Sequence, residues 1–300
     1  MISGILLLDK PLGLSSNAAL QRARRLLGGP KAGHVGSLDP LATGMLPICL
    51  GEATKVASHI LSARKSYRFA IALGSRTATG DREGAVVETA AVPVIQSATI
   101  MAALARFMGP QKQTPPMYSA LKRDGQPLYA LARAGLEVDR EARDIEIFDL
   151  RLISHRADSL ELEVLSSKGT YVRTLGEDIS RALGTCGHLT QLRRLYVEPF
   201  QGLPMETLDG VAAAVEAGRL PGLLPADAPL QHIPRVALDA QSVIKVRRGQ
   251  SVRAPSPIGA EHGQPMPVRL YGPDDTFIGL GEADDFGFVQ PRRLFVSDER

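Results

Sequence analysis

Two periods of apolar residues run along this chain, and each predicts a type of element. Apolar and polar positions alternate between Ser66 and Leu73, which is the two-residue period of a strand. Between Ala19 and Leu27 apolar residues lie three and four apart, after serines that can cap a helix and before Gly28-Gly29-Pro30, which ends one. The same reasoning predicts further strands at 4–8, 145–153 and 160–165, and further helices at 100–108, 128–134 and 174–183.

The segment 31–55 follows neither period. It is rich in glycine and proline, and it holds His34 and Asp39 five residues apart. A loop of this length inside a compact domain usually has a functional role. We therefore predict a long functional loop here.

The pattern changes again near the C-terminus. Residues 220–234 are rich in proline, leucine and alanine, which is typical of a linker. Beyond them, short apolar runs at 268–271, 277–281 and 286–289 are separated by glycine and proline. Such runs predict a small β-barrel-like domain over 235–300, after a larger domain over 1–230.

Composition narrows the class of protein. With 300 residues, 44% of them hydrophobic and 22% charged, the chain can bury a large core. Cys49 and Cys186 form no Cys-x-x-Cys pair, which argues against a zinc or iron–sulfur site and fits a reducing compartment. The first ten residues favour a strand over a signal peptide, and no apolar run approaches the roughly 18 residues of a membrane span. We expect a cytoplasmic protein without a metal or a membrane anchor.

The net charge of +3 does not indicate a type of partner, but the charged residues are unevenly distributed along the chain. The first 35 residues hold five basic residues and a single acid, Asp9. This excess fits either a polyanionic partner or an ordinary solvated surface, and charge alone favours the second.

One carboxylate stands out in the segment 31–55. Asp39 precedes Pro40, which holds it in an extended or turn conformation, and neighbouring glycines let the backbone approach a ligand closely. The pattern suits a carboxylate presented in a cleft. For an isolated Asp-Pro, however, an Asx-turn in which the side chain bonds only its own backbone is the commoner case.

Sequence motifs before, around and after Asp39 favour the functional carboxylate over the Asx-turn. They are Asp9-Lys10-Pro11, Gly33-His34-Val35-Gly36-Ser37-Leu38-Asp39-Pro40-Leu41-Ala42-Thr43-Gly44, Gly51-Glu52-Ala53-Thr54-Lys55, Lys65-Ser66-Tyr67-Arg68, Leu73-Gly74-Ser75-Arg76-Thr77, Pro116-Met117-Tyr118-Ser119-Ala120-Leu121-Lys122, Ser167-Lys168-Gly169-Thr170-Tyr171-Val172-Arg173-Thr174 and Leu192-Arg193-Arg194-Leu195. In this order they resemble the motifs of the tRNA pseudouridine synthase B family, from about residue 4 to residue 196.

The resemblance implies an α+β fold. A catalytic domain of the pseudouridine synthase type would surround a mixed, mostly antiparallel sheet, and a small β-barrel-like domain of the PUA type would follow it. The implied reaction is isomerisation of the uridine at tRNA position 55, in the T-loop, to pseudouridine through a flipped-out base. Moving the ribose bond from N1 to C5 of uracil needs no redox partner and no energy source, so no cofactor is expected. tRNA is the one partner that follows, and we expect a monomer.

The resemblance also assigns the site. Asp39 would be the catalytic nucleophile or base, and Arg173 would pair with it and keep it ionised by lowering its pKa. Tyr67 would stack on the target uracil, and Leu192 would line the uracil pocket. Tyr171, two residues before Arg173, would share a strand face with it and contact the substrate.

The remaining assignments concern RNA. His34 would hold the everted RNA, since a uridine inside a folded loop has to be flipped out before it can be reached. The charged region 114–143 would be an insertion that grips RNA. Candidate contacts of the RNA backbone are Lys55, Lys122, Arg123, Arg193 and Arg194.

Two other functions stay open. A non-catalytic module that binds or folds tRNA would need a basic surface, but it would not need Asp39, Tyr67 and Arg173 together. A hydrolase that uses Asp39 would need a second carboxylate or a metal cluster at motif spacing, and the sequence offers neither.

Overall fold

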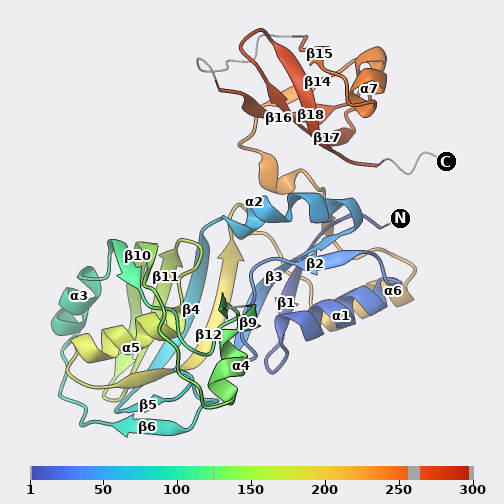
Figure 1. The fold of residues 1–300 in the computed structure, drawn as a ribbon. Coiled ribbons are helices and arrows are strands. Elements are labelled where there is room, and N and C mark those ends of the chain that lie inside the picture. Colours follow the sequence, from blue (N-terminus) through green and yellow to red (C-terminus); the bar gives the residue numbers. More distant parts are fainter. Residues whose placement is uncertain (1, 124, 256–263, 297–300) are drawn as a thin grey trace.

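The larger of two main sheets has nine strands in the computed structural model, which describes residues 2–123, 125–255 and 264–296 (Figure 1). They are β1 (Gly4–Lys10), β2 (Ala32–His34), β3 (Ala42–Leu50), β4 (Lys65–Leu73), β7 (Gly109–Gln113), β10 (Arg143–Arg156), β11 (Ser159–Ser166), β12 (Gly187–Val197) and β13 (Leu223–Leu224). Their order in space is β13-β1-β3-β12-β4-β11-β10-β7, with β2 attached to β3. β3 and β12 run parallel and the other neighbours run antiparallel, so the predicted mixed, mostly antiparallel sheet is confirmed.

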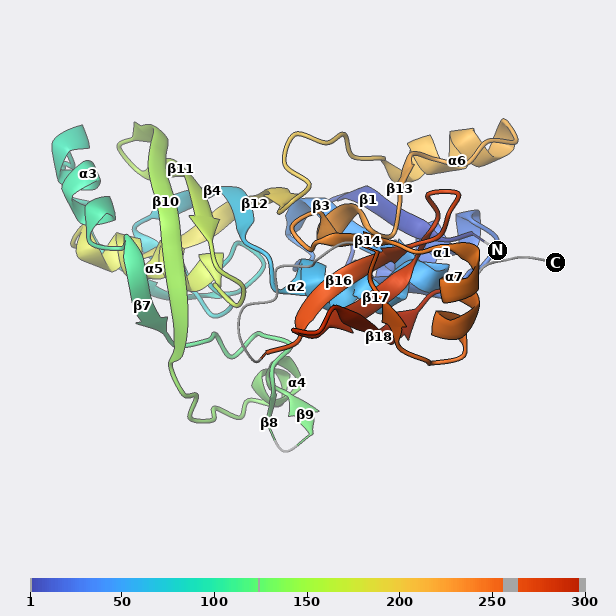
Figure 2. The ribbon, with the colours of Figure 1, turned by 90° about the horizontal axis from the view of Figure 1, so that it is seen from above.

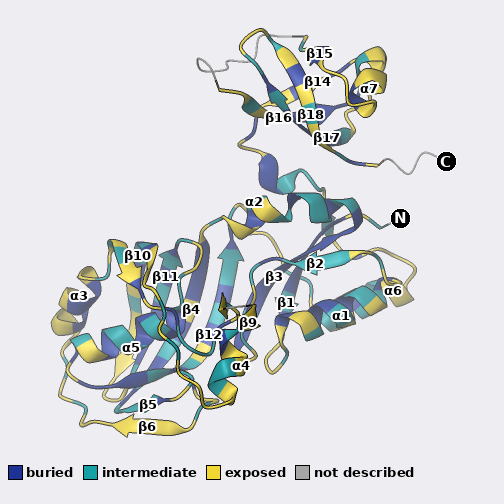
Figure 3. Cartoon of the chain, in the orientation of Figure 1, coloured by how far each residue is buried: buried dark blue, intermediate teal, exposed yellow. Residues whose placement is uncertain are grey.

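Helices α1 (Ser16–Leu26) and α5 (Val172–Ala182) pack their apolar faces into one core with the sheet. The predicted serine cap of α1 is confirmed, since the Ser15 hydroxyl accepts a hydrogen bond from the Ala18 N–H. The buried residues of α1 lie on one face, three and four apart, as the helical period requires. Figure 3 shows buried residues gathered on the central strands and exposed residues over the periphery.

The peripheral elements are shorter. They are η1 (Gly51–Val56), α2 (Ala57–Leu61), β5 (Ser75–Thr77), β6 (Val86–Thr89), α3 (Ser97–Ala105), β8 (Lys122–Arg123), β9 (Gln126–Pro127), α4 (Leu128–Arg133), α6 (Leu208–Glu216) and η2 (Ala228–Leu230). The group β8, β9 and α4 stands out from the sheet in the region 114–143 (Figure 2). None of the helices in the described part of the chain combines the length and apolar character needed to cross a membrane.

The prediction of a long loop over 31–55 is wrong. β2, β3 and η1 occupy most of this segment, and the loop itself is confined to residues 35–41. β3 lies between β1 and β12 with nearly all of its side chains buried, so it lacks the alternation that marks a half-exposed strand. Pro47 makes β3 still harder to predict from the sequence, because proline is uncommon inside a strand. That proline falls between the stretch of β3 that pairs with β12 and the stretch that pairs with β2.

Gly44 makes the β3–β12 contact possible. Its φ is +97°, and a Cβ at this position would lie 2.1 Å from the carbonyl oxygen of Arg194. We expect Gly44→Ala to lower the free energy of unfolding by about 3 kcal/mol or more, because the two strands must separate to admit the methyl group. Urea unfolding at fixed pH measures this loss.

Gly33→Ala is the matched control. Gly33 lies on β2, beside the same loop, and no atom lies within 4 Å of its Cβ position. The expected loss there is below about 1 kcal/mol. Equal losses for the two variants would contradict the assignment of Gly44 to close backbone packing.

The smaller sheet has five strands, β14 (Arg235–Ala237), β15 (Val252–Arg253), β16 (Met266–Tyr271), β17 (Phe277–Ala283) and β18 (Phe288–Leu294), in the order β14-β16-β17-β18-β15. Helix α7 (Ala240–Arg247) packs against β15 and β18. The sheet curls into a half-barrel (Figure 2). This shape agrees with the predicted β-barrel-like domain of the PUA type.

A packed contact joins the smaller sheet to the larger domain. Phe295 and Leu280 belong to an apolar cluster that extends into β1 and α2. The Lys55 ammonium donates a hydrogen bond to the Leu294 carbonyl at 2.7 Å and lies 5.6 Å from the centre of the Phe295 ring. Arg293 in turn donates to the Lys55 carbonyl at 2.8 Å. Lys55, predicted to contact the RNA backbone, therefore takes part in the contact between the domains.

Candidate active site

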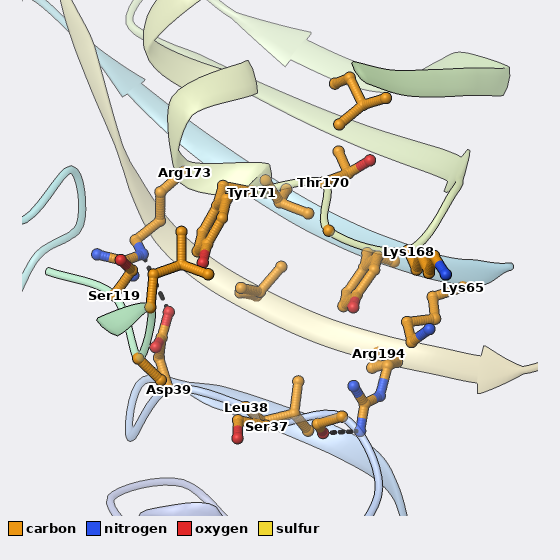
Figure 4. Close-up of a pocket in the computed structure, with 18 of the residues that line it drawn as sticks. Ser37, Leu38, Asp39, Lys65, Ser119, Lys168, Thr170, Tyr171, Arg173 and Arg194 are labelled. Atoms are coloured by element: carbon orange, nitrogen blue, oxygen red, sulfur yellow. Dashed lines mark hydrogen bonds and ion pairs between the residues drawn. The ribbon is translucent and has the colours of Figure 1, made fainter. Parts of the chain in front are cut away.

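A cavity of about 530 Å³ opens where the loop 35–41 meets β4, β12 and the start of α5 (Figure 4). The two predicted catalytic residues and three of the four predicted substrate residues line it: Asp39, Arg173, Tyr67, Tyr171 and Leu192. These residues are far apart in sequence. The sheet order β3-β12-β4 and the position of α5 bring them together.

The loop that carries Asp39 is anchored on both sides of it. The buried Ser16 hydroxyl donates to the Leu38 carbonyl at 3.0 Å and accepts from the Leu38 N–H at 2.7 Å. The Gly13 N–H donates to the Pro40 carbonyl at 2.9 Å. Asp39 thus stands between two fixed residues, and its carboxylate pairs with Arg173 instead of forming the Asx-turn.

Arg173 holds Asp39 with its side chain fully engaged. Its Nε lies 3.0 Å from Asp39 Oδ2, while its two terminal nitrogens donate to the carbonyls of Thr79 and Tyr118, both at 2.7 Å. The side chain is only 4% exposed. Because a guanidinium is a rigid planar fork, three acceptors in these directions fix its orientation and so fix the carboxylate.

The expected strand face shared by Tyr171 and Arg173 is wrong. Arg173 is the second residue of α5, and Tyr171 is the extended residue that precedes this helix. Gln113 positions Tyr171 instead: its side-chain oxygen accepts from the Tyr171 N–H at 2.7 Å, and its amide donates to the Tyr171 carbonyl at 3.1 Å. Both predicted side chains still point into the cavity (Figure 4).

The electrostatics of Asp39 differ from the expectation. Burial raises the pKa of Asp39 above its ordinary value, Arg173 opposes this rise, and the neighbouring Asp81 adds to it. Asp81 is 3% exposed, and its Oδ2 lies 3.9 Å from Arg173 Nε, so two carboxylates share one guanidinium. The predicted pair of Arg173 and Asp39 is confirmed, and Arg173 lowers the pKa of Asp39 as expected, but burial has the larger and opposite effect. Arg173 limits the rise that burial causes.

Asp81, which follows the string 73–77, is a site residue to which the sequence analysis assigns no role. Its carboxylate accepts from the Thr79 hydroxyl at 2.5 Å and from the Glu83 N–H at 3.1 Å. Gly80 has a φ of +74°, and a Cβ there would lie 3.4 Å from the Cβ of Arg173. A glycine directly before an acid, within a polar turn, was the available signal.

Tyr67 and Leu192 form the apolar wall of the cavity. Each is 8% exposed, and they lie on the adjacent strands β4 and β12. His34, by contrast, lies on β2 and does not line the cavity. Its buried Nδ1 has no hydrogen-bond partner among the described residues. Burial and then Arg194 lower the pKa of His34, which favours the neutral ring.

Of the other predicted RNA-backbone residues, two are exposed to solvent and two are held by contacts within the protein. Lys122 and Arg123 are exposed on β8, in the region that stands out from the sheet. Arg193 pairs with Asp9 at 2.8 Å. Arg194 is 1% exposed and donates to the carbonyls of Met45 and Gly36, so it braces the loop 35–41 and lines the cavity, away from the outer surface.

The described part of the chain contains no group of three or more His, Cys, Asp or Glu side chains arranged to hold a metal ion. Both cysteines are buried and free. At the end that holds Asp39, the cavity offers the chemistry of a carboxylate beside a guanidinium, and two tyrosines, Tyr67 and Tyr171, are among the other lining residues.

Three family models match the chain in succession. The N-terminal domain of TruB family pseudouridylate synthases matches residues 24–172. The C-terminal domain of tRNA pseudouridylate synthase B matches residues 173–231. The C-terminal domain of pseudouridine synthase II TruB matches residues 234–295.

Curated relatives extend over nearly the whole chain. The chain is 49% identical to tRNA pseudouridine synthase B of Aromatoleum aromaticum over 294 residues, which is 98% of this chain and 93% of the relative. It is 47% identical to the protein of the same name from Chromohalobacter salexigens, over 98% of this chain and 94% of the relative.

Solved structures show the same fold. The TM-score is 0.72 against a chain of a Cbf5-Nop10-Gar1 complex, at 24% identity, over 98% of this chain and 85% of that one. It is 0.73 against a chain of an H/ACA RNP bound to a substrate RNA containing 2′-deoxyuridine, at 21% identity, over 99% of this chain and 86% of that one.

Proposed function

We propose that this chain, which belongs to the TruB family of pseudouridylate synthases, converts the uridine at position 55 in the T-loop of tRNA to pseudouridine. The observation that carries the proposal is the ion pair of Asp39 and Arg173, 3.0 Å apart, inside a cavity of about 530 Å³. A cavity of this size accommodates one nucleotide. The relatives named tRNA pseudouridine synthase B support tRNA as the substrate.

In the proposed reaction the target uridine leaves the T-loop and its uracil stacks on Tyr67, against Leu192. Asp39, held by Arg173, acts as the nucleophile or base that allows the bond between ribose and N1 to break. The uracil then turns, and C5 bonds to the ribose. N1 gains a proton and C5 loses one, so the product is an isomer of the substrate. Burial raises the pKa of the Tyr171 phenol, which therefore stays protonated beside the carboxylate.

The RNA would lie across both domains. We propose that residues 1–230 form the catalytic domain, that the region 114–143 grips the RNA through Lys122 and Arg123, and that residues 235–300 bind it a second time. The support is positional, since Ser119 of that region lines the cavity. His34 would fill the space that the flipped base leaves. We propose that the protein acts on tRNA as a monomer in the cytoplasm.

The test uses an unmodified tRNA transcript and a matched transcript with cytidine at position 55. Pseudouridine is mapped in both after incubation with the protein. We expect product at position 55 of the first transcript and none in the second. Pseudouridine at another position would refute the assignment of position 55 as the target. Tight binding without any product would instead favour the non-catalytic tRNA-binding module.

A further inference from the structure

Cations line the end of the cavity that lies away from Asp39. Lys65, Lys168 and Arg194 gather there, opposite the pair of Asp39 and Arg173 (Figure 4). Lys65 is 7% exposed and Arg194 is 1% exposed, whereas Lys168 is exposed at the rim. The two buried side chains meet at Gly36, where a Cβ would lie 3.2 Å from Arg194 Nη1 and 3.5 Å from Lys65 Cε.

The hydrogen bonds of the two buried cations go to neutral backbone groups. The Lys65 ammonium donates to the carbonyls of Leu61, at 3.0 Å, and Ala63, at 2.6 Å. The Arg194 Nε donates to the Met45 carbonyl at 2.6 Å, and its Nη2 donates to the Gly36 carbonyl at 2.9 Å. Within the part of the chain that the structure describes, one proton of Lys65 and the Nη1 group of Arg194 are left for another acceptor.

No carboxylate among the described residues forms an ion pair with Lys65, Lys168 or Arg194. Asp144 also lines this cavity, but it pairs with Lys112 at 3.1 Å. Burial lowers the pKa of Lys65 to about 8, and repulsion from Arg194 and then Lys168 adds to this effect. Buried charges in proteins are normally paired, so this end of the cavity lacks one anion.

We propose that Lys65, Lys168 and Arg194 bind a phosphodiester of the RNA that flanks the flipped nucleotide. The inference rests on the proposed function, because it takes the target nucleotide to enter this cavity. A phosphate has the charge and the several acceptor oxygens that the two buried donors and the exposed ammonium require. Arg194 also holds the Gly36 carbonyl, so the bound phosphate would brace the loop that carries Asp39.

The test removes one negative charge at a time from the RNA. A T-arm hairpin carries a neutral methylphosphonate on either the 5′ or the 3′ side of the target uridine, and its Kd is measured at fixed salt. We expect one of the two linkages to weaken binding to the wild-type protein by about tenfold, as for the loss of a charge-assisted hydrogen bond. In Lys168→Ala, whose exposed position keeps the fold intact, the penalty for that linkage should fall to about threefold or less.

Lys245→Ala is the matched control, since Lys245 is an exposed lysine on α7, outside the cavity. It should keep the full penalty of the methylphosphonate even if it weakens binding in general. The inference is overturned if neither linkage affects the wild-type protein, or if Lys168→Ala retains the whole penalty. Pseudouridine formation on the unmodified hairpin is assayed in parallel. If pseudouridine forms but Lys168→Ala does not reduce the methylphosphonate penalty, the phosphate site alone is refuted. If Lys168→Ala reduces the penalty but no pseudouridine forms, the proposed function alone is refuted.

Discussion

Asp39→Asn is expected to abolish pseudouridine formation while tRNA binding is retained. Asparagine has nearly the same shape, and its side-chain oxygen can still accept a hydrogen bond from Arg173 Nε, which lies 3.0 Å from the Asp39 carboxylate. It cannot act as a nucleophile or accept a proton. With enzyme in excess over tRNA, the single-turnover rate constant should fall by about 10⁴-fold or more, and the Kd should change by less than about threefold.

The stability of this variant provides a control on the loss of activity. Burial raises the pKa of Asp39 in the folded protein above its unfolded value, so ionised Asp39 destabilises the fold. This penalty is absent below the unfolded pKa and develops as the pH rises through the folded one. Asp39→Asn should therefore melt at or above the wild-type temperature at pH 7. The exposed Asp158, on the turn between β10 and β11, gives the matched variant Asp158→Asn, which should keep the wild-type rate. A rate for Asp39→Asn within tenfold of wild type would refute the role given to Asp39.

Arg173→Met is expected to slow the bound reaction by about 10²- to 10³-fold, the usual cost of removing one preorganised electrostatic contact. It should also move the acid limb of the pH–rate profile. Ionised Asp39 is the active form, so the rate falls as the pH falls through its pKa. Arg173 lowers that pKa against the effect of burial, and its removal lets the pKa rise. The acid limb of Arg173→Met must then lie at higher pH than that of the wild type.

Arg173→Lys separates charge from geometry. Lysine keeps the positive charge, so its acid limb should stay close to that of the wild type. A single ammonium cannot reproduce the planar fork that reaches Asp39, Thr79 and Tyr118 together, so the rate should still fall. Urea unfolding and tRNA binding check that both variants fold. If the acid limb is the same in the methionine variant and in the wild type, the electrostatic role of Arg173 is wrong.

Much of the larger domain could be predicted from the sequence, because an element with one buried and one exposed face has a periodic apolar pattern. The alternation around Tyr67 predicts β4, and the cap at Ser15 predicts the start of α1. β3 escaped prediction because it is buried on both faces and interrupted by Pro47. Most of the segment 31–55 therefore lies in β2, β3 and η1 and not in the predicted loop. Its functional part, residues 35–41, depends on β3 for its position.

The site could be located from motif strings, but its physical state could not. Long-range contacts decide what each residue does, and no local pattern reports them. Lys55 has the same character in sequence as Lys122, yet it contacts Phe295 at the domain boundary while Lys122 faces solvent. The pKa of Asp39 depends on burial and on Asp81, which lies 42 positions further along the chain. Arg194 is basic and lies beside Arg193, but only the fold reveals that its guanidinium is buried beneath Gly36.

The most direct test of the account is a crystal structure of Asp39→Asn bound to a T-arm hairpin with uridine at the target position. The account predicts that this uridine has left the loop and that its uracil stacks on Tyr67. The bond between its ribose and N1 should then lie within about 4 Å of the side chain at position 39. A target uridine that remains stacked inside the RNA loop, or one held in the cavity with this bond more than about 8 Å from that side chain, would contradict it.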